Sequence, residues 1–197
     1  MIFLSNEYKD WEKDKIEEEQ QIVQKYPFLH IRDIDGTIDT HSKFPMMSLE
    51  IPDGWEMLFT QFCDDLKEVL IEEGHLNTFY FVQIKEKYNR LECYSGHFET
   101  DKISQVLRKY EYLSQFVCTQ CGKPATIETV QGYIESFCDD CWQAQHRRCM
   151  ARDIEFDTLF KISTFEISTF GRSTGTVTTV INVSDEWNRY LKSIEVK

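Results

Sequence analysis

Two cysteine pairs with matched spacing constrain the fold of this 197-residue chain more than any other feature of its sequence. Cys118 and Cys121 form the first Cys-x-x-Cys pair, and Cys138 and Cys141 form the second after sixteen intervening residues. A Cys-x-x-Cys turn presents two sulfurs to one tetrahedral ion, with each metal–sulfur distance about 2.3 Å. The spacing therefore predicts that four thiolates bind one metal ion. A site that is closed in this way is structural rather than catalytic.

Zinc is the metal that this ligand set favours, and iron is the alternative. Structural zinc sites have binding energies of roughly 10–16 kcal/mol, so the ion would hold the small module folded. Residues 126–130 and 133–137 are the expected strands of a zinc ribbon, and Gln131-Gly132 is the expected turn between them. Two other interpretations stay open: His146 or Cys149 replaces one ligand, or the cysteines are ordinary buried or redox-active residues.

The cysteines also bear on the compartment of the protein. There are seven of them, whereas a secreted disulfide framework favours an even number and dispersed spacing. No apolar run approaches the length of a membrane-spanning helix, and the first residues lack the features of a secretory signal. We therefore expect a cytoplasmic protein in which the paired cysteines bind metal. The unpaired Cys63 and Cys93 are expected to pack inside the protein.

Hydrophobic periodicity predicts a mixed α+β fold, with a small antiparallel sheet and packed helices. Apolar residues at helical spacing predict three helices before the cysteine module, at residues 5–26, 54–73 and 101–115. β-branched and aromatic residues predict two strands between the second and third helices, at residues 77–88 and 91–95. Asp53 is the expected N-cap of the second helix, and Gly74 is its expected C′ residue.

The composition changes after the cysteine module. Thr, Ile, Val and Phe become frequent, which predicts two or three strands within residues 154–183, and Ser184 is the expected cap of a last short helix. We therefore expect three parts along the chain: an α+β domain at 1–115, a zinc-ribbon module at 116–150, and a β-rich extension at 151–197.

Net charge limits the class of partner. The chain has 22 Lys and Arg against 34 Asp and Glu, a formal charge of −12, which is repelled by phosphate backbones and anionic membranes. The most basic patch is formed by Lys123, the run His146-Arg147-Arg148, and Arg152. A zinc ribbon that binds nucleic acid through this patch is one hypothesis. Acidic residues in the same module favour a ribbon that contacts protein.

A short acidic motif suggests an enzyme as another hypothesis. Asp33-Ile34-Asp35-Gly36-Thr37 resembles the first motif of haloacid-dehalogenase-type phosphatases, in which the first Asp is the nucleophile and the second a general acid. The segment before it is a poor buried strand, no βαβ alternation follows, and turn chemistry explains the pattern equally well. Phosphate processing by Asp33 and Asp35 therefore stays an alternative, and we assign no catalytic residue.

Several motifs occur together as they do in one protein family. These are Asp53-Gly54-Trp55, the run Val82-Gln83-Ile84-Lys85-Glu86-Lys87-Tyr88, Tyr112-Leu113-Ser114, and the two cysteine pairs. Over about residues 26–142, the chain resembles a family of small uncharacterised proteins of bacteria, prophages and phages. It departs from the family at residues 89–92, where the family has a double glycine and a basic residue. The resemblance implies a phage or prophage accessory protein in the bacterial cytoplasm, and it brings no assigned activity.

The leading hypothesis is a non-enzymatic, zinc-containing protein that binds a host protein. We expect this binding to inhibit a component of host defence or transcription. The hypothesis depends on three observations: the metal site is closed, no catalytic constellation is visible, and acidic residues surround the cysteine module.

Overall fold

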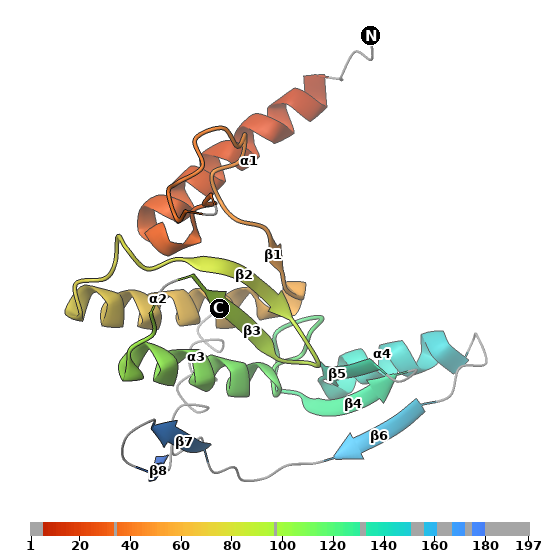
Figure 1. The fold of residues 1–197 in the computed structure, drawn as a ribbon. Helices are drawn as coiled ribbons and strands as arrows, with labels where there is room; N and C mark the ends of the chain where they lie inside the picture. Colours follow the sequence, from red (N-terminus) through yellow and green to blue (C-terminus); the bar gives the residue numbers. More distant parts are fainter. Residues whose placement is uncertain are drawn as a thin grey trace.

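The computed structural model describes residues 6–33, 35–96, 98–130, 133–150, 156–160, 167–171 and 175–179. The fold is mixed α+β, as the sequence predicts (Figure 1). In chain order the elements are α1 (Asn6–Lys25), η1 (Pro27–Leu29), β1 (Leu49–Glu50), η2 (Asp53–Trp55), α2 (Glu56–Glu72), β2 (Phe81–Glu86), β3 (Leu91–Ser95), α3 (Asp101–Ser114), β4 (Thr126–Val130), β5 (Tyr133–Phe137), α4 (Asp139–Met150), β6 (Phe156–Phe160), β7 (Ile167–Gly171) and β8 (Gly175–Thr179).

The first sheet has the strand order β1-β2-β3 and is mixed rather than antiparallel. β2 and β3 form an antiparallel hairpin, and the two-residue β1 pairs parallel to β2. β1 lies in a segment rich in turn-forming residues, so the sequence pattern did not predict it. β2 is shorter than the expected strand because residues 75–79 form turns, with Phe79 N–H donating to the His75 carbonyl.

α2 and α3 run side by side along the sheet (Figure 1). Phe62 of α2 lies at the centre of this core: its ring centroid is 6.0 Å from that of Phe81 in β2 and 5.4 Å from that of Tyr110 in α3. Phe28 of η1 reaches the same cluster through Phe81, with centroids 6.0 Å apart. The buried Cys63 belongs to this core, as expected.

The ends of the helices follow known capping rules in two cases and depart from the prediction in one. Gly74 has φ +73° and ends α2 in a Schellman motif, in which His75 N–H donates to the Leu70 carbonyl. Thr100 caps α3, and its hydroxyl accepts from Ile103 N–H. Asp53 is not the N-cap of α2: it starts the turn η2, which precedes α2 and brings Gly54 and Trp55 into the core.

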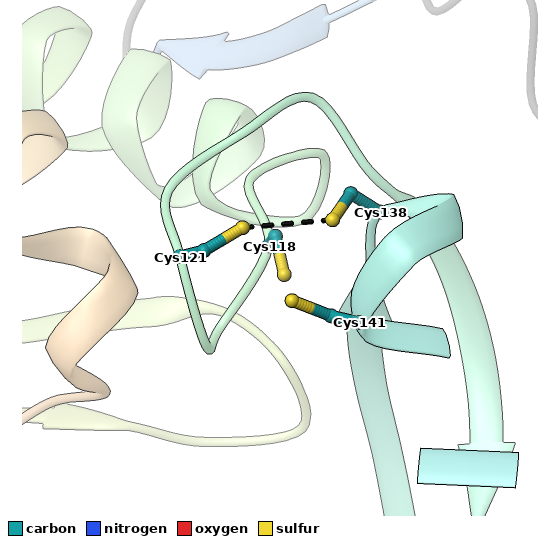
Figure 2. Close-up of side chains that lie close together, drawn as sticks. All are labelled: Cys118, Cys121, Cys138 and Cys141. Carbon is teal, nitrogen blue, oxygen red and sulfur yellow. Dashed lines mark hydrogen bonds between the residues drawn. The ribbon is translucent and has the colours of Figure 1, made fainter. Parts of the chain in front are cut away.

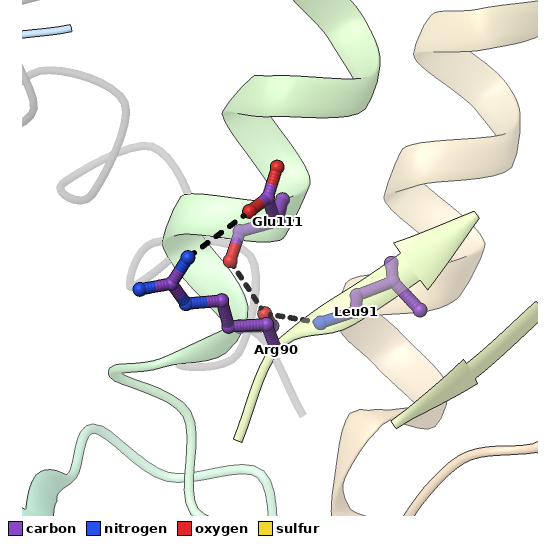
Figure 3. A network of polar contacts seen from close by, with 4 residues as sticks. Arg90, Leu91 and Glu111 are labelled. Atoms are coloured by element: carbon purple, nitrogen blue, oxygen red, sulfur yellow. Dashed lines mark hydrogen bonds and ion pairs between the residues drawn. The ribbon is translucent and has the colours of Figure 1, made fainter. Parts of the chain in front are cut away.

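The β2–β3 hairpin is tied to the end of α3 by a polar network (Figure 3). Ser114 Oγ accepts from Leu91 N–H at 2.9 Å and donates to the Glu111 carbonyl at 2.8 Å. The Arg90 guanidinium lies 3.4 Å from the Glu111 carboxylate. This network holds the start of β3 against the end of α3.

The cysteine module contains the two predicted ribbon strands. β4 and β5 pair antiparallel, and β6 pairs with the other edge of β4, giving the order β5-β4-β6. β6 lies beyond residue 150, so the first strand of the expected extension joins the ribbon sheet. β7 and β8 form a separate hairpin. The expected turn at 131–132 and the helix expected at Ser184 lie outside the described residues.

Candidate metal centre

The structure brings the four predicted ligands together. The Sγ atoms of Cys118, Cys121, Cys138 and Cys141 all lie within 4.8 Å of one another and point toward a common centre (Figure 2). The sulfurs of Cys121 and Cys138 are 3.5 Å apart, which is a contact and not a disulfide, and all four thiols are free. Within the described part of the chain, this is the one group of three or more Cys, His, Asp or Glu residues that could hold a metal ion.

The first pair sits in a tight turn that follows α3. Cys118 N–H donates to the Lys123 carbonyl at 2.8 Å, and Gly122 N–H donates to the Cys118 carbonyl at 3.0 Å. Gly122 has φ +75°, a conformation that L side chains rarely adopt, so glycine is required for the chain to turn back here. The turn that carries Cys118 and Cys121 is therefore held by its own backbone bonds.

The second pair spans the junction between β5 and α4. Cys138 follows the last residue of β5, and Cys141 lies in the first turn of α4, where Trp142 N–H donates to the Cys138 carbonyl at 2.8 Å. α4 was not predicted from the sequence. Asp139 and Asp140 in its first turn are the signal that could have found it, because acidic residues are favourable at a helix N-terminus.

The four thiols differ in exposure, and the pKa values of Cys118 and Cys141 shift in opposite directions. Cys118 and Cys138 are buried, Cys141 is half-buried and Cys121 is exposed, so one side of the cluster faces solvent. Burial alone would raise the pKa of Cys118, but backbone N–H groups of Cys138, Gln120 and Cys121 outweigh it and lower that pKa. Burial raises the pKa of Cys141, and contacts with the other three sulfurs raise it further.

These properties fit a bound cation. Metal–sulfur distances of about 2.3 Å in a tetrahedral site place the sulfurs about 3.8 Å from one another, which agrees with a cluster whose sulfurs all lie within 4.8 Å. Four thiolates at this separation repel one another, and a divalent cation at their centre removes that repulsion and keeps them deprotonated. The arrangement can therefore hold a metal ion.

The first cysteine turn packs directly on the entry to α2. Gly54 N–H donates to the Thr119 carbonyl at 3.0 Å, and the Trp55 indole N–H donates to the Val117 carbonyl at 3.1 Å. Trp55 is fully buried. The cysteine cluster is thus continuous with the main core, a connection that the sequence did not reveal because the partners are more than sixty positions apart.

A second connection joins the β2–β3 turn to the ribbon. Tyr88 and Asn89 both have positive φ, as a two-residue hairpin turn requires. The buried Asn89 amide donates to Ser136 Oγ of β5 at 2.6 Å, and Ser136 Oγ donates in turn to the Gln115 carbonyl at the end of α3. Asn89 is therefore both a turn residue and a link between the two sheets.

The alternative catalytic residues occupy a surface turn. Asp33 and Asp35 are exposed, and Asp35 Oδ1 accepts from both the backbone N–H and the hydroxyl of Thr37, at 3.0 and 2.7 Å. The hydrogen bonds from Thr37 lower the pKa of Asp35. These bonds are those of an Asx-type turn, and among the described residues the two carboxylates form no metal-binding group with a third ligand.

The expected basic patch is only partly within the described residues. Lys123 pairs with Asp140 at 3.1 Å across the cysteine module, so its charge is partly satisfied there. Arg147 is exposed on α4. The side chains of His146, Arg148 and Cys149, and all of Arg152, lie outside the described residues.

Comparisons with known proteins add no assignment: no family model matches the chain, and neither a curated protein nor a solved structure matches it. Among the helices that the structure describes, none is both long and apolar enough to cross a membrane.

Proposed function

We propose that the protein is a zinc-containing, non-enzymatic binding protein that acts on another protein. The observation that carries this is the closed four-cysteine cluster, which offers sulfur ligands only and leaves no position for a substrate. Zinc accounts for such a set better than iron because it needs no redox role and favours tetrahedral sulfur ligands. The reducing bacterial cytoplasm keeps these thiols available, and the family resemblance adds the setting of a phage or prophage accessory protein.

The excess of acidic charge supports a protein partner over nucleic acid. The chain carries a formal charge of −12, and a bound divalent cation with four thiolates leaves the cluster itself negative. Such a surface repels phosphate and attracts basic protein surfaces. A host defence or transcription protein with a basic face is the partner that we propose, with inhibition as the consequence.

Metal analysis tests the first half of the proposal. We expect about one zinc per purified chain, and loss of most of it in Cys138→Ser, because three sulfurs bind zinc less tightly than four. Cys93→Ser is the matched control: Cys93 is half-buried in β3, outside the cluster, and its replacement is expected to leave the zinc content unchanged. Iron in place of zinc, or equal metal loss in both variants, would contradict the assignment.

Capture from lysate tests the second half. Full-length, zinc-loaded protein immobilised on beads is expected to retain one specific protein from a bacterial lysate treated with nuclease. The same experiment without nuclease separates the alternatives, because a nucleic-acid binder loses its captured material on nuclease treatment and its affinity falls steeply with salt. Capture of nucleic acid alone, or of no specific protein, would contradict the proposal.

A further inference from the structure

An open groove of about 460 Å³ lies between α1 and α2, beside the segment that leads into β1. Its lining is mainly apolar. Leu29 and Phe59 are buried and belong to the core, whereas Ile22, Met46 and Ile51 are half-buried and pack against it. The floor of the groove is therefore core surface that stays accessible from outside.

Three carboxylates surround this apolar floor. Glu18 of α1, Asp53 of η2 and Glu56 of α2 line the groove and are exposed, and within the described part of the chain none of them forms an ion pair. Several other acidic residues of the same two helices are paired with lysine, among them Glu19 with Lys15, Asp64 with Lys25 and Asp65 with Lys109. Asp14 and Glu68 form no ion pair within the described residues either, but they do not line the groove.

The position of a residue in its helix explains two of these three carboxylates but not the third. Asp53 and Glu56 precede or begin α2, where the helix dipole favours a negative charge. Glu18 lies in the interior of α1 and has no such local role. Charges from three elements, α1, η2 and α2, therefore converge on one groove, and their field is stronger over its low-dielectric floor than it would be over water.

We propose that this groove binds a short basic segment of a protein partner, which inserts an apolar side chain into the floor and places Lys or Arg beside the three carboxylates. This inference rests on the proposed protein-binding function and adds the site and the partner's chemistry. An apolar anchor with flanking cations matches both the lining and the charge of the groove. A second copy of this chain matches less well, because its own charge of −12 would face the three carboxylates, which form an acidic rim around the groove.

The acidic rim has a defined end. Asp53 and Glu56 also line a neighbouring hollow of similar volume, which Cys121 and Lys123 of the first cysteine turn border. A partner's Lys or Arg that extended past Glu56 would approach the positive charge of Lys123. The basic part of the partner therefore lies on the side of Asp53 and Glu56 that faces α1.

Fluorescence anisotropy with a defined probe tests the inference. The probe is a short labelled peptide with Leu at helical spacing and Lys elsewhere, and the protein is the full-length, zinc-loaded chain. Thr60→Arg places bulk and a positive charge at the exposed edge of the groove, and we expect it to weaken binding at least tenfold. Glu68→Arg is the matched control. It changes the charge of α2 by more than Thr60→Arg does, but at an exposed residue that does not line the groove. We expect it to weaken peptide binding much less than Thr60→Arg.

Two further peptides separate the contributions. Peptides with Glu in place of Lys, or with Ser in place of Leu, are expected to bind at least tenfold more weakly than the parent, and added salt is expected to weaken the parent. Equal binding of the Glu peptide, or equal binding by Thr60→Arg, would overturn the inference. So would a dimer in sedimentation that Thr60→Arg dissociates, since the occupant would then be a second copy.

Capture from lysate distinguishes this inference from the proposed function. A host protein retained equally by the native chain and by Thr60→Arg would overturn the groove while leaving the protein-binding function standing. Peptide binding that Thr60→Arg abolishes, together with no captured host protein, would support the groove and contradict the proposed function.

Discussion

At Gly54 the backbone that enters α2 passes so close to the first cysteine turn that no side chain fits between them. A Cβ atom placed there would lie 2.2 Å from the Cys118 carbonyl oxygen and 2.8 Å from Cys121 N, and both are backbone atoms that cannot swing away. Gly54 has no positive φ, so it is required for space alone. The residue therefore controls how closely the metal-binding turn approaches the core.

We expect Gly54→Ala to destabilise the protein by about 1–3 kcal/mol, as overpacking of a tight contact does, and to weaken metal binding. Gly74→Ala is the comparison, because Gly74 has a positive φ and open space around it. That variant is expected to cost about 1 kcal/mol through backbone strain and to leave metal affinity intact. Urea unfolding and competition with a chelator measure the two effects, and equal metal affinity in both variants would contradict the role of Gly54.

Glu135 of β5 makes stability depend on pH. Burial raises the pKa of Glu135, the Glu86 carboxylate raises it further, and a hydrogen bond from Thr119 partly offsets the shift. The folded state therefore holds this proton more tightly than the unfolded state, whose glutamates ionise near pH 4.3. As pH rises from that value through the folded pKa, the residue's contribution to the free energy of unfolding falls.

Glu135→Gln removes this dependence. We expect the variant to be more stable than the native chain at pH 7, by less than about 1 kcal/mol because the residue is only half-buried. The difference should narrow as pH falls and both chains become neutral at this position. Urea unfolding at several pH values, with the same zinc loading in each sample, measures it. A variant that is less stable at pH 7 would show that ionised Glu135 is stabilising.

Single residues divide clearly into those that the sequence could predict and those that it could not. The four cysteines were predictable because their spacing alone defines a ligand set, and the structure brings them together. Asn89 was not, because its partner Ser136 lies 47 positions away and an Asn in a hairpin turn has a sufficient local explanation. The groove was not predictable either, since its lining comes from two stretches, residues 18–29 and 46–63, whose packing against each other leaves no local signal.

At the scale of elements, strands and helices with strong local patterns were predicted within a few residues. β4 and β5 have the predicted bounds, and α3 differs from its predicted range by one residue. β1 and α4 were missed for different reasons. β1 is defined by its partner β2 rather than by its own two residues. α4 begins inside the second cysteine pair, whose residues were assigned to metal binding and not to a helix.

The entry to α2 is attached to the four-cysteine cluster more directly than the rest of that helix is. Gly54 and Trp55 precede α2 and are hydrogen-bonded to the first cysteine turn, whereas the C-terminal end of α2 has its own Schellman cap. We expect removal of the metal by a chelator to speed hydrogen exchange in residues 53–58 well before it affects residues 66–72. Mass spectrometry of peptides from the two regions measures this, and equal acceleration in both would indicate global unfolding instead.

For the whole molecule, the expected boundary between residues 115 and 116 stays a prediction, and several contacts cross it. Trp55 and Gly54 bond across it to the cysteine turn, and Asn89 bonds across it to β5. If the ribbon opened alone, the bond from the buried Trp55 indole to Val117 and the bond from the Asn89 amide to Ser136 would be left unmade. Each such loss costs about 1–3 kcal/mol. The contacts therefore couple the two parts energetically.

We accordingly expect one cooperative unfolding transition in the zinc-loaded protein. Loss of helical circular dichroism and release of zinc to an indicator dye should have the same urea midpoint, because the two parts unfold together. Gly54→Ala is expected to separate the two midpoints by loosening the contact. Zinc release at a clearly lower urea concentration in the native chain would show that the ribbon is an independent unit.

The bond between Trp55 and Val117 has a consequence for how the protein is made. During synthesis, α2 emerges from the ribosome long before the second cysteine pair, which lies more than sixty residues further along the chain. The Trp55 indole N–H lacks its acceptor until Val117 is made, and the cysteine cluster lacks half its sulfurs until Cys138 and Cys141 follow. The N-terminal core therefore gains this hydrogen bond only when the first cysteine turn docks on it, and we expect a shortage of the bound metal during synthesis to leave nascent chains that expose an aromatic surface to chaperones and proteases.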